Sequence, residues 1–342
     1  MRKKGFTLTS HLVCLLILLA VLLMCVCLGS VSIPLRDTLA VFRNALTGKA
    51  TEASTYRSIL LSIRLPRVLC VTLCGASLSL SGAAMQGLLR NPLADGSTLG
   101  VSSGASLGAV LALAFGVTVP GLPYAGTTGM AMLFAFGSLM LILSLAYALD
   151  RSLSTHSIIL IGVIFSMFAT SLISLVVSFS GDKIKSVTFW TMGSLAGSNY
   201  THVLLMAVAL LVCGTVLLRL KEELNAFAVG EENALQVGVA VKKVKLTILI
   251  AVSVLIGVCV SIGGTIAFIG LVTPHTARML VGPNHRRLLP ASMYFGAIFL
   301  LLADLIARTL LRPIELSVGV VTSLVGAAAF VLIFYHTRKG AK

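Results

Sequence analysis

The chain has 342 residues, a length that in a soluble protein would predict two or three domains. Its composition excludes that class, because 57% of the residues are hydrophobic and only 11% are charged, whereas soluble domains carry about 25% charged residues. The same composition excludes extended disorder, a collagen-like chain and a secreted disulfide scaffold. The net charge is +15, but the basic residues are scattered between apolar runs, which favours membrane orientation over nucleic-acid binding.

Ten membrane-spanning segments are expected, because a crossing helix needs about 20 apolar residues. Eight long stretches carry no charge: 5–35, 68–89, 96–149, 152–181, 186–218, 246–277, 288–303 and 316–337. The first is too long for the core of a signal peptide and is predicted as a span. The 96–149 stretch breaks at Pro120-Gly121-Leu122-Pro123. The 246–277 stretch divides at Gly263-Gly264 and Pro274, with its shorter part near 274–282, and the 288–303 stretch continues to about Leu311.

We predict an all-α polytopic membrane protein with one transmembrane domain over residues 1–342, because 220–245 is the only sizeable polar interruption. Ten crossings place both termini on one side, and the basic N-terminus nominates the cytoplasm. The basic residues assigned to the cytoplasmic side are Arg2, Lys3, Lys4, Arg90, Arg151, Arg219, Lys221, Lys242, Lys243, Lys245, Arg278, Arg286, Arg287, Arg338, Lys339 and Lys342. Those assigned to the outer side are Arg36, Arg43, Lys49, Arg57, Arg64, Arg67, Lys183, Lys185, Arg308 and Arg312. The bias supports this orientation, but the outer basic residues require an explanation of their own.

No catalytic, cofactor or metal site is predicted from the motifs. The seven cysteines lie inside apolar runs and are interpreted as small buried hydrophobes. There is no G-x-x-x-x-G-K-[ST] phosphate loop and no H-E-x-x-H helix. If the chain belongs to an ATP-driven pump, a separate chain must therefore hydrolyse the ATP.

An internal repeat is suggested by residues that recur 182 positions apart. The matching pairs are Gly75 and Gly257, Ser79 and Ser261, Gly82 and Gly264, Leu89 and Leu271, and Pro92 and Pro274. Five crossings separate the two sets, so the helices would run in opposite directions, as in an inverted-topology repeat. The alternative is coincidence, since glycine and serine are common where membrane helices pack closely.

Several segments in order resemble the FecCD-type permeases, the membrane subunits of ABC importers for iron-siderophores, haem and vitamin B12. They are Arg64 to Arg67, Met85 to Asp95, Leu99 to Ala105, Trp190 to Leu195, Gly264 to His275, Leu302 to Asp304 and Glu315 to Thr322. The resemblance implies a ten-helix inverted-repeat fold in a bacterial cell membrane. It also implies a second copy of the chain, or a related permease, together with cytoplasmic ATPases and an extracytoplasmic substrate-binding protein.

The polar segment 222–238 is ordinarily interpreted as a solvated loop. The resemblance implies instead that its Gly-Glu-Glu pattern forms short helices seated in a cleft of the ATPase, an arrangement that can transmit force. The expected coupling residues are Gly230, Glu231, Glu232, Ala234 and Gly238.

Three arginines are expected at the outer helix ends: Arg64, Arg67 and Arg308. They could simply snorkel to the interface, and Asp304 lies one turn before Arg308 on the same helix face. The resemblance implies that they receive acidic residues of the binding protein. It also implies a cytoplasmic gate at Thr155 and His156, although a histidine at a helix start is usually a cap or an interface residue.

Two other function classes remain as alternatives. An ion-coupled secondary transporter needs acidic or basic residues inside the membrane as ion sites, and Asp304 is the only carboxylate within a predicted span. An intramembrane enzyme needs a nucleophile–base pair or a metal cluster, and the sequence shows neither.

Overall fold

The computed structural model describes residues 8–29, 31, 33–47, 55–121, 125–151 and 154–339, and these residues contain helices but no β-strand. Within these described residues, seven helical runs are long and apolar enough to cross a membrane. They are α1 (Leu8–Cys27), Tyr56–Leu88 with α4 (Leu65–Leu88) as its main part, α6 (Ala125–Leu149), α7 (Thr155–Phe179), α9 (Tyr200–Arg219), α12 (Val241–Gly263) and α14 (His285–Thr309). Three further membrane segments are α5 (Val101–Phe115), α13 (Ile269–Val281) and α15 (Val318–Lys339). Together they give the ten segments predicted from the sequence.

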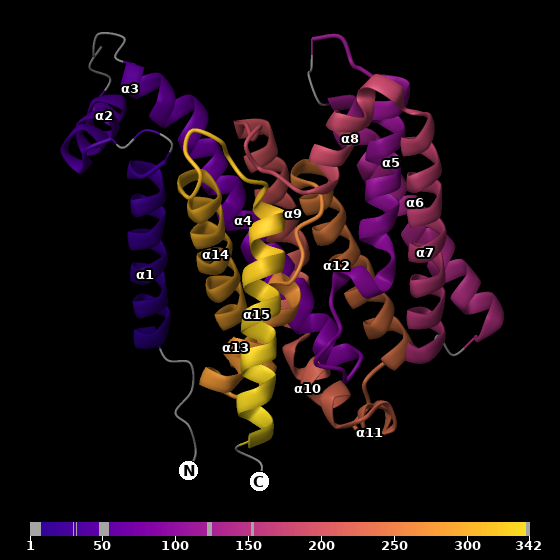
Figure 1. Cartoon of the computed structure of the whole chain (residues 1–342). Helices are drawn as coiled ribbons and strands as arrows, with labels where there is room; N and C mark the ends of the chain where they lie inside the picture. The colour runs from indigo at the N-terminus through magenta and orange to yellow at the C-terminus, as the bar shows by residue number, and fades with distance from the viewer. Residues whose placement is uncertain are drawn as a thin grey trace.

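Short helices connect these segments. They are α2 (Leu35–Thr47), α3 (Thr55–Ser58), the π-helical turn Ile59–Arg64, the 3₁₀ turns Gly96–Leu99 and Gly181–Lys183, α8 (Ile184–Thr191), α10 (Lys221–Val229) and α11 (Glu231–Gln236). Figure 1 shows α1 beginning and α15 ending at the same end of the bundle, with α10 and α11 also there. We call this end the termini side and the opposite end, with α3 and α8, the distal side. Five of the basic residues used to predict orientation, Arg2, Lys3, Lys4, Lys49 and Lys342, lie outside the described residues.

Helix α13 differs from its prediction, because it begins at Ile269 and contains Pro274 instead of starting there. Proline has no N–H, so the carbonyl of Gly270 loses its usual intrahelical partner. The side-chain amide of Gln86 on α4 donates to that carbonyl at 3.2 Å and to the carbonyl of Leu271 at 3.3 Å. A neighbouring helix thus satisfies the backbone that Pro274 leaves open, and the helix continues.

The two halves of the predicted repeat pack in a related way at the level of whole helices. Helix α4 packs against α13 and α14, whereas α12 packs against α5 and α6; within each group, α13 packs on α14 and α5 on α6. Individual residues 182 positions apart are not equivalent, however. Pro92 follows the end of α4 while Pro274 lies inside α13, and Gly82 is inside α4 while Gly264 caps the end of α12. The connections between corresponding helices differ in length, so no single spacing in the sequence relates the two halves.

Helix α4 forms the centre of the bundle, and small residues let its neighbours approach it closely. Gly75 faces the backbone of Gly296 on α14, and Gly82 faces the backbone of Gly270 on α13, so a β-carbon at any of these positions would meet a main-chain atom. Close backbone approach at small residues is the usual way in which helices associate in lipid. These contacts confirm the packing role expected of the small residues in α4.

Candidate coupling, gate and translocation sites

The predicted coupling segment folds into two short helices on the termini side (Figure 1). Helix α10 ends at Val229, α11 begins at Glu231, and Gly230 forms the corner between them with φ of 153°. Side-chain-bearing residues rarely adopt this φ, so the corner favours glycine. A β-carbon there would also lie 3.1 Å from the side-chain amide of Asn233. Gly230 is buried, so its role is to form the corner between α10 and α11 rather than to contact a partner.

The remaining coupling residues differ in their exposure. Ala234 is fully buried, whereas Glu232 and Gly238 face solvent. The exposed edge of α11 and the turn after it also carry two apolar side chains, Leu235 at 57% and Val237 at 72% exposure. An apolar edge in a polar segment on the surface suits contact with a partner.

Glu231 has an internal partner. Its Oε1 lies 2.7 Å from Nζ of Lys245 on α12, whose side chain is only 1% exposed while that of Glu231 is 41% exposed. A buried ammonium needs a paired negative charge. The Glu231 carboxylate therefore joins the coupling segment to α12, a contact that the polarity of the segment alone did not reveal.

Thr155 and His156 lie in the first turn of α7, on the termini side. The turn is capped by Ser154, whose Oγ accepts a hydrogen bond from the backbone N–H of Ser157 at 3.3 Å. Thr155 is half-buried and His156 is exposed. The structure places both at the predicted end of the bundle but does not bring them to the coupling segment.

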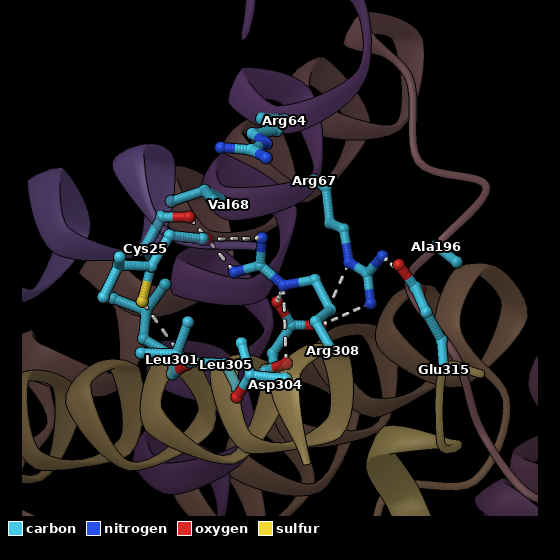
Figure 2. A network of polar contacts seen from close by, with 12 residues as sticks. Cys25, Arg64, Arg67, Val68, Ala196, Leu301, Asp304, Leu305, Arg308 and Glu315 are labelled. Carbon is cyan, nitrogen blue, oxygen red and sulfur yellow. Dashed lines mark hydrogen bonds and ion pairs between the residues drawn. The ribbon is translucent and has the colours of Figure 1, made fainter. Parts of the chain in front are cut away.

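Two of the three predicted arginines, Arg67 and Arg308, form a buried network near the distal side with Asp304, and Glu315 pairs with Arg67 at its edge (Figure 2). Arg67 donates from Nε at 3.0 Å and from Nη2 at 2.9 Å to Oδ1 of Asp304, and from Nη1 at 2.7 Å to Glu315. Oδ2 of Asp304 lies 2.9 Å from Nε of Arg308. The Asp304–Arg308 proximity expected from helix spacing is thus confirmed as an ion pair.

Arg64 and Arg308 hold the end of α1. Arg64 donates to the carbonyls of Val26 at 2.8 Å and Cys27 at 2.9 Å and also to that of Val31, while Arg308 reaches those of Cys25 and Leu28. The last carbonyls of a helix have no intrahelical partner and carry partial negative charge. The guanidinium groups satisfy them in place of water.

The sequence led us to expect these arginines at the outer surface, and this expectation of exposure is wrong. Arg64 is 5%, Arg67 6% and Arg308 3% exposed. Glu315, whose side chain is 35% exposed, covers Arg67. The partners come from α1, from α14 itself and from the α14–α15 connection, and a single sequence gives no signal that these segments meet at Arg64 and Arg67.

A cavity of about 450 Å³ lies between α4, α5, α7, α8 and the α12–α13 connection. The connection, residues 264–268, is non-helical and begins and ends with positive φ at Gly264 and Phe268. Non-helical backbone at membrane depth is tolerated where it lines a cavity. Six hydroxyl side chains contribute to the lining: Ser102, Ser103, Ser106, Thr170, Thr191 and Thr265. Asp95 is the one charged residue among the described lining residues.

Helix α7 carries a row of hydroxyls from the cavity toward the distal side. Ser166, Thr170, Ser174 and Ser178 each donate to the carbonyl four residues earlier, at 2.8–3.0 Å. The last three of these residues are exposed. Their spacing of four residues keeps them along one side of the helix. We call this row the α7 hydroxyl ladder.

A family model described as the FecCD transport family matches residues 16–336. This chain belongs to the FecCD transport family. The FecCD chain is 42% identical over 317 residues to YvrB of Bacillus subtilis, named as an uncharacterized ABC transporter permease; the match covers 92% of this chain and 90% of YvrB. It is 37% identical over 286 residues to MolB of Haemophilus influenzae, a molybdate import system permease, with 83% of each chain covered.

A solved structure described as a metal-chelate-type ABC transporter in an inward-facing conformation has the same fold as this FecCD chain. The TM-score is 0.83 at 32% identity, over 96% of this chain and 99% of the solved one. With the apolar helices, these matches make the FecCD chain a multi-pass membrane protein and the permease subunit of a metal-chelate-type ABC importer.

Proposed function

We propose that this permease imports an iron-siderophore-type chelate, with haem and cobalamin as related candidates, and that separate cytoplasmic ABC ATPases supply the energy. The observation that carries the ATPase part of the proposal is the pair α10–α11, which presents an apolar edge on the termini side while its other face is anchored to the bundle. An amphipathic short helix set into a groove of a partner is an established recognition mode. In this arrangement the termini side is the cytoplasmic side, and both termini lie in the cytoplasm.

The cavity supports a chelate over a bare oxyanion such as molybdate. Its volume of about 450 Å³ falls in the range of sites for drug-sized organic ligands, roughly 300–1,000 Å³. No arginine, lysine or histidine is among its described lining residues, and such residues are the usual partners of small oxyanions. Hydroxyls fit a ligand whose metal charge is already neutralised by its own donor atoms.

The α7 hydroxyl ladder supports a second copy of this chain across the pathway. Exposed polar side chains on a membrane helix are costly against lipid and usually face a water-filled space or a partner. In a homodimer, two such ladders would enclose the pathway. Thr155 and His156, at the cytoplasmic start of the same helix, then form the proposed gate.

The binding protein is proposed to contact the distal side through an acidic residue directed at Arg67, since Arg64 and Arg308 are occupied by the end of α1 and by Asp304. Because Glu315 covers Arg67, an incoming carboxylate would take the place of Glu315. We therefore expect Glu315→Gln to tighten binding of the purified binding protein to the permease in nanodiscs by at least about twofold at low salt, where exposed charge pairs are least screened. Equal affinities of variant and wild type across salt concentrations would contradict docking at Arg67.

The alternative, an ion-coupled secondary transporter, is less well supported. Asp304 would have to be its ion site, but Asp304 is fully buried and bound by Arg67 and Arg308. A carboxylate neutralised by two guanidinium groups does not offer a vacant cation site. The arginine network thus removes the residue on which this alternative depended.

Transport in proteoliposomes tests the proposed function. The permease is reconstituted with its ATPase and supplied with binding protein and labelled ferric siderophore, haem, cobalamin or molybdate. We expect uptake of the siderophore that needs ATP hydrolysis and binding protein and persists when ionophores collapse all ion gradients. Molybdate uptake would contradict the substrate, and gradient-driven uptake without the ATPase would contradict the ABC mechanism.

A further inference from the structure

Asn225 of α10 forms hydrogen bonds with the start of α14. Its Oδ1 accepts hydrogen bonds from the backbone N–H of His285 at 2.8 Å and from Nδ1 of the same residue at 3.0 Å. Its Nδ2 donates to Oδ1 of Asn284, the N-cap residue of α14, at 3.3 Å. The first amides of a helix need partners from outside the helix. The start of α14 is therefore capped in part by a residue of the coupling segment.

The ring of His285 is wedged between three helices. His285 is only 2% exposed, and its Nε2 faces Gly87 on α4, where a β-carbon would collide with the ring. The backbone donor fixes the oxygen of Asn225 toward His285, which assigns the hydrogen to Nδ1. Nε2 has no hydrogen-bond partner among the described residues. Asn225 binds one side of the ring, and the other side fits against α4 because Gly87 has no side chain.

The two halves of the coupling segment are attached differently. Leu224 and Phe227 of α10 are fully buried, so α10 is fixed to the bundle, whereas α11 exposes Leu235 and Val237. Helix α14 has 25 residues and is about 37 Å long at 1.5 Å per residue. Its far end carries Asp304 and Arg308 in the arginine network. It therefore connects the coupling segment to the distal side in one piece.

We propose that Asn225 and His285 form a latch that transmits displacement of the coupling segment to α14 and so to the arginine network. The inference rests on the proposed function, because the ATPase acting on α11 supplies the displacement. Asn225 and His285 are positioning residues here: their bonds fix the first turn of α14 to α10, and without them a displacement of α10 reaches that turn only through apolar packing. Glu231 and Lys245 make the separate connection to α12.

Cysteine labelling in membrane vesicles tests the latch without a transported ligand. Leu310 directly follows α14 and is 64% exposed, and Val237 lies on the proposed ATPase contact. Leu310→Cys and Val237→Cys are labelled in separate permease–ATPase complexes, first without nucleotide and then with ATP and vanadate, which trap the ATPase with ADP after hydrolysis. In the otherwise wild-type complex, we expect trapping to change the labelling rate at position 310 by about fivefold or more, the lower range of coupling between distant sites.

Asn225→Ala should reduce this change at position 310 to less than about twofold, while the ATPase still protects position 237. Asn225→Asp keeps the acceptor and should restore the response. Asn199→Ala is the control, because Asn199 also accepts from a helix N-terminal amide, the N–H of His202 at 3.0 Å, but as the N-cap of its own helix α9 and outside the coupling segment. His285→Leu removes only the ring contact. The double variant with Asn225→Ala should reduce the labelling response at position 310 no more than Asn225→Ala alone does, as expected if the two residues act as one unit.

The outcomes separate the latch from the proposed function. If the ATPase does not protect position 237 in the otherwise wild-type complex, the proposed coupling surface is wrong. If position 237 is protected but position 310 responds equally in Asn225→Ala and wild type, or in neither, the latch is overturned. Should Asn225→Ala fail to accumulate, His285→Leu removes the ring bond alone and should reduce the response at position 310 in part; a response equal to wild type would then overturn the latch.

Discussion

At the scale of single residues, the chain relies on buried charges whose partners are far apart in sequence. Arg67 pairs with Asp304 and with Glu315, 248 residues away. Arg64 and Arg308 bind main-chain carbonyls at the end of α1. Lys245 pairs with Glu231. Removing one partner from a buried pair is far more harmful than removing an exposed charge, because the other charge remains desolvated.

Asp304→Asn is expected to destabilise the permease strongly. It leaves Arg67 and Arg308 buried side by side, a change that costs about 3–5 kcal/mol when a buried pair is broken. Thermal unfolding of the detergent-purified protein measures the effect, with Glu315→Gln as the control because its side chain is 35% exposed. An equal loss of stability in the two variants would contradict the central place of Asp304 in the network.

At the scale of elements, α4 is the helix against which both halves of the repeat are arranged. Its glycines meet the backbones of α13 and α14, and Gln86 completes the hydrogen bonding of α13 around Pro274. Helix α13 is only 13 residues long, about 20 Å, and cannot cross a hydrocarbon core of about 30 Å by itself. It depends on the 264–268 connection and on α4 for its position.

Gly82→Ala should disrupt this crossing. The new methyl group meets the backbone of Gly270, which cannot move aside as a flexible side chain would, and overpacking of this kind costs roughly 1–3 kcal/mol. Gly137→Ala on α6 is the matched control, because a β-carbon there meets nothing within 4 Å. The two variants are compared by melting temperature in the same detergent, and a drop in Gly82→Ala without one in Gly137→Ala is expected.

The coupling segment allows a second test at this scale. Glu231→Lys places two ammonium groups together. It should lower the amount of substrate transported per ATP hydrolysed by at least about fivefold. The double variant Glu231→Lys, Lys245→Glu restores opposite charges. Recovery of transport per ATP hydrolysed would show that Glu231 acts through Lys245, whereas continued uncoupling would show that its carboxylate contacts the ATPase directly.

At the scale of the whole molecule, counting apolar stretches was sufficient to predict ten helical segments, because the bilayer imposes their length. The same reasoning misplaced the start of α13, because a proline ordinarily predicts a helix boundary. The hydrogen bond from Gln86 that allows the helix to continue past Pro274 comes from a residue distant in the sequence. Charge counting located Arg64, Arg67 and Arg308 at helix ends but could not show that they are buried. Burial depends on contacts between distant segments, and local patterns do not contain that information.

Orientation is tested on the assembled molecule. Lys183→Cys, on the distal side, should react with a membrane-impermeant maleimide added outside intact cells, and Glu232→Cys only after the membrane is opened. The expectation follows from the basic bias of the segments on the termini side. Reversed accessibility would place the coupling segment outside the cell and remove the ATPase from the proposal.

The α7 hydroxyl ladder bears on how a membrane with such a pathway retains its proton gradient. A proton moves along a chain of hydroxyls only if every group can accept a proton and donate one onward. Ser166, Thr170, Ser174 and Ser178 direct their hydrogens back to their own helix, and each would have to give up a bond worth about 0.5–1.5 kcal/mol to relay a proton. In the proposed pathway these hydroxyls therefore do not form a proton relay of their own, and any proton leak there would run through water rather than through the helix wall.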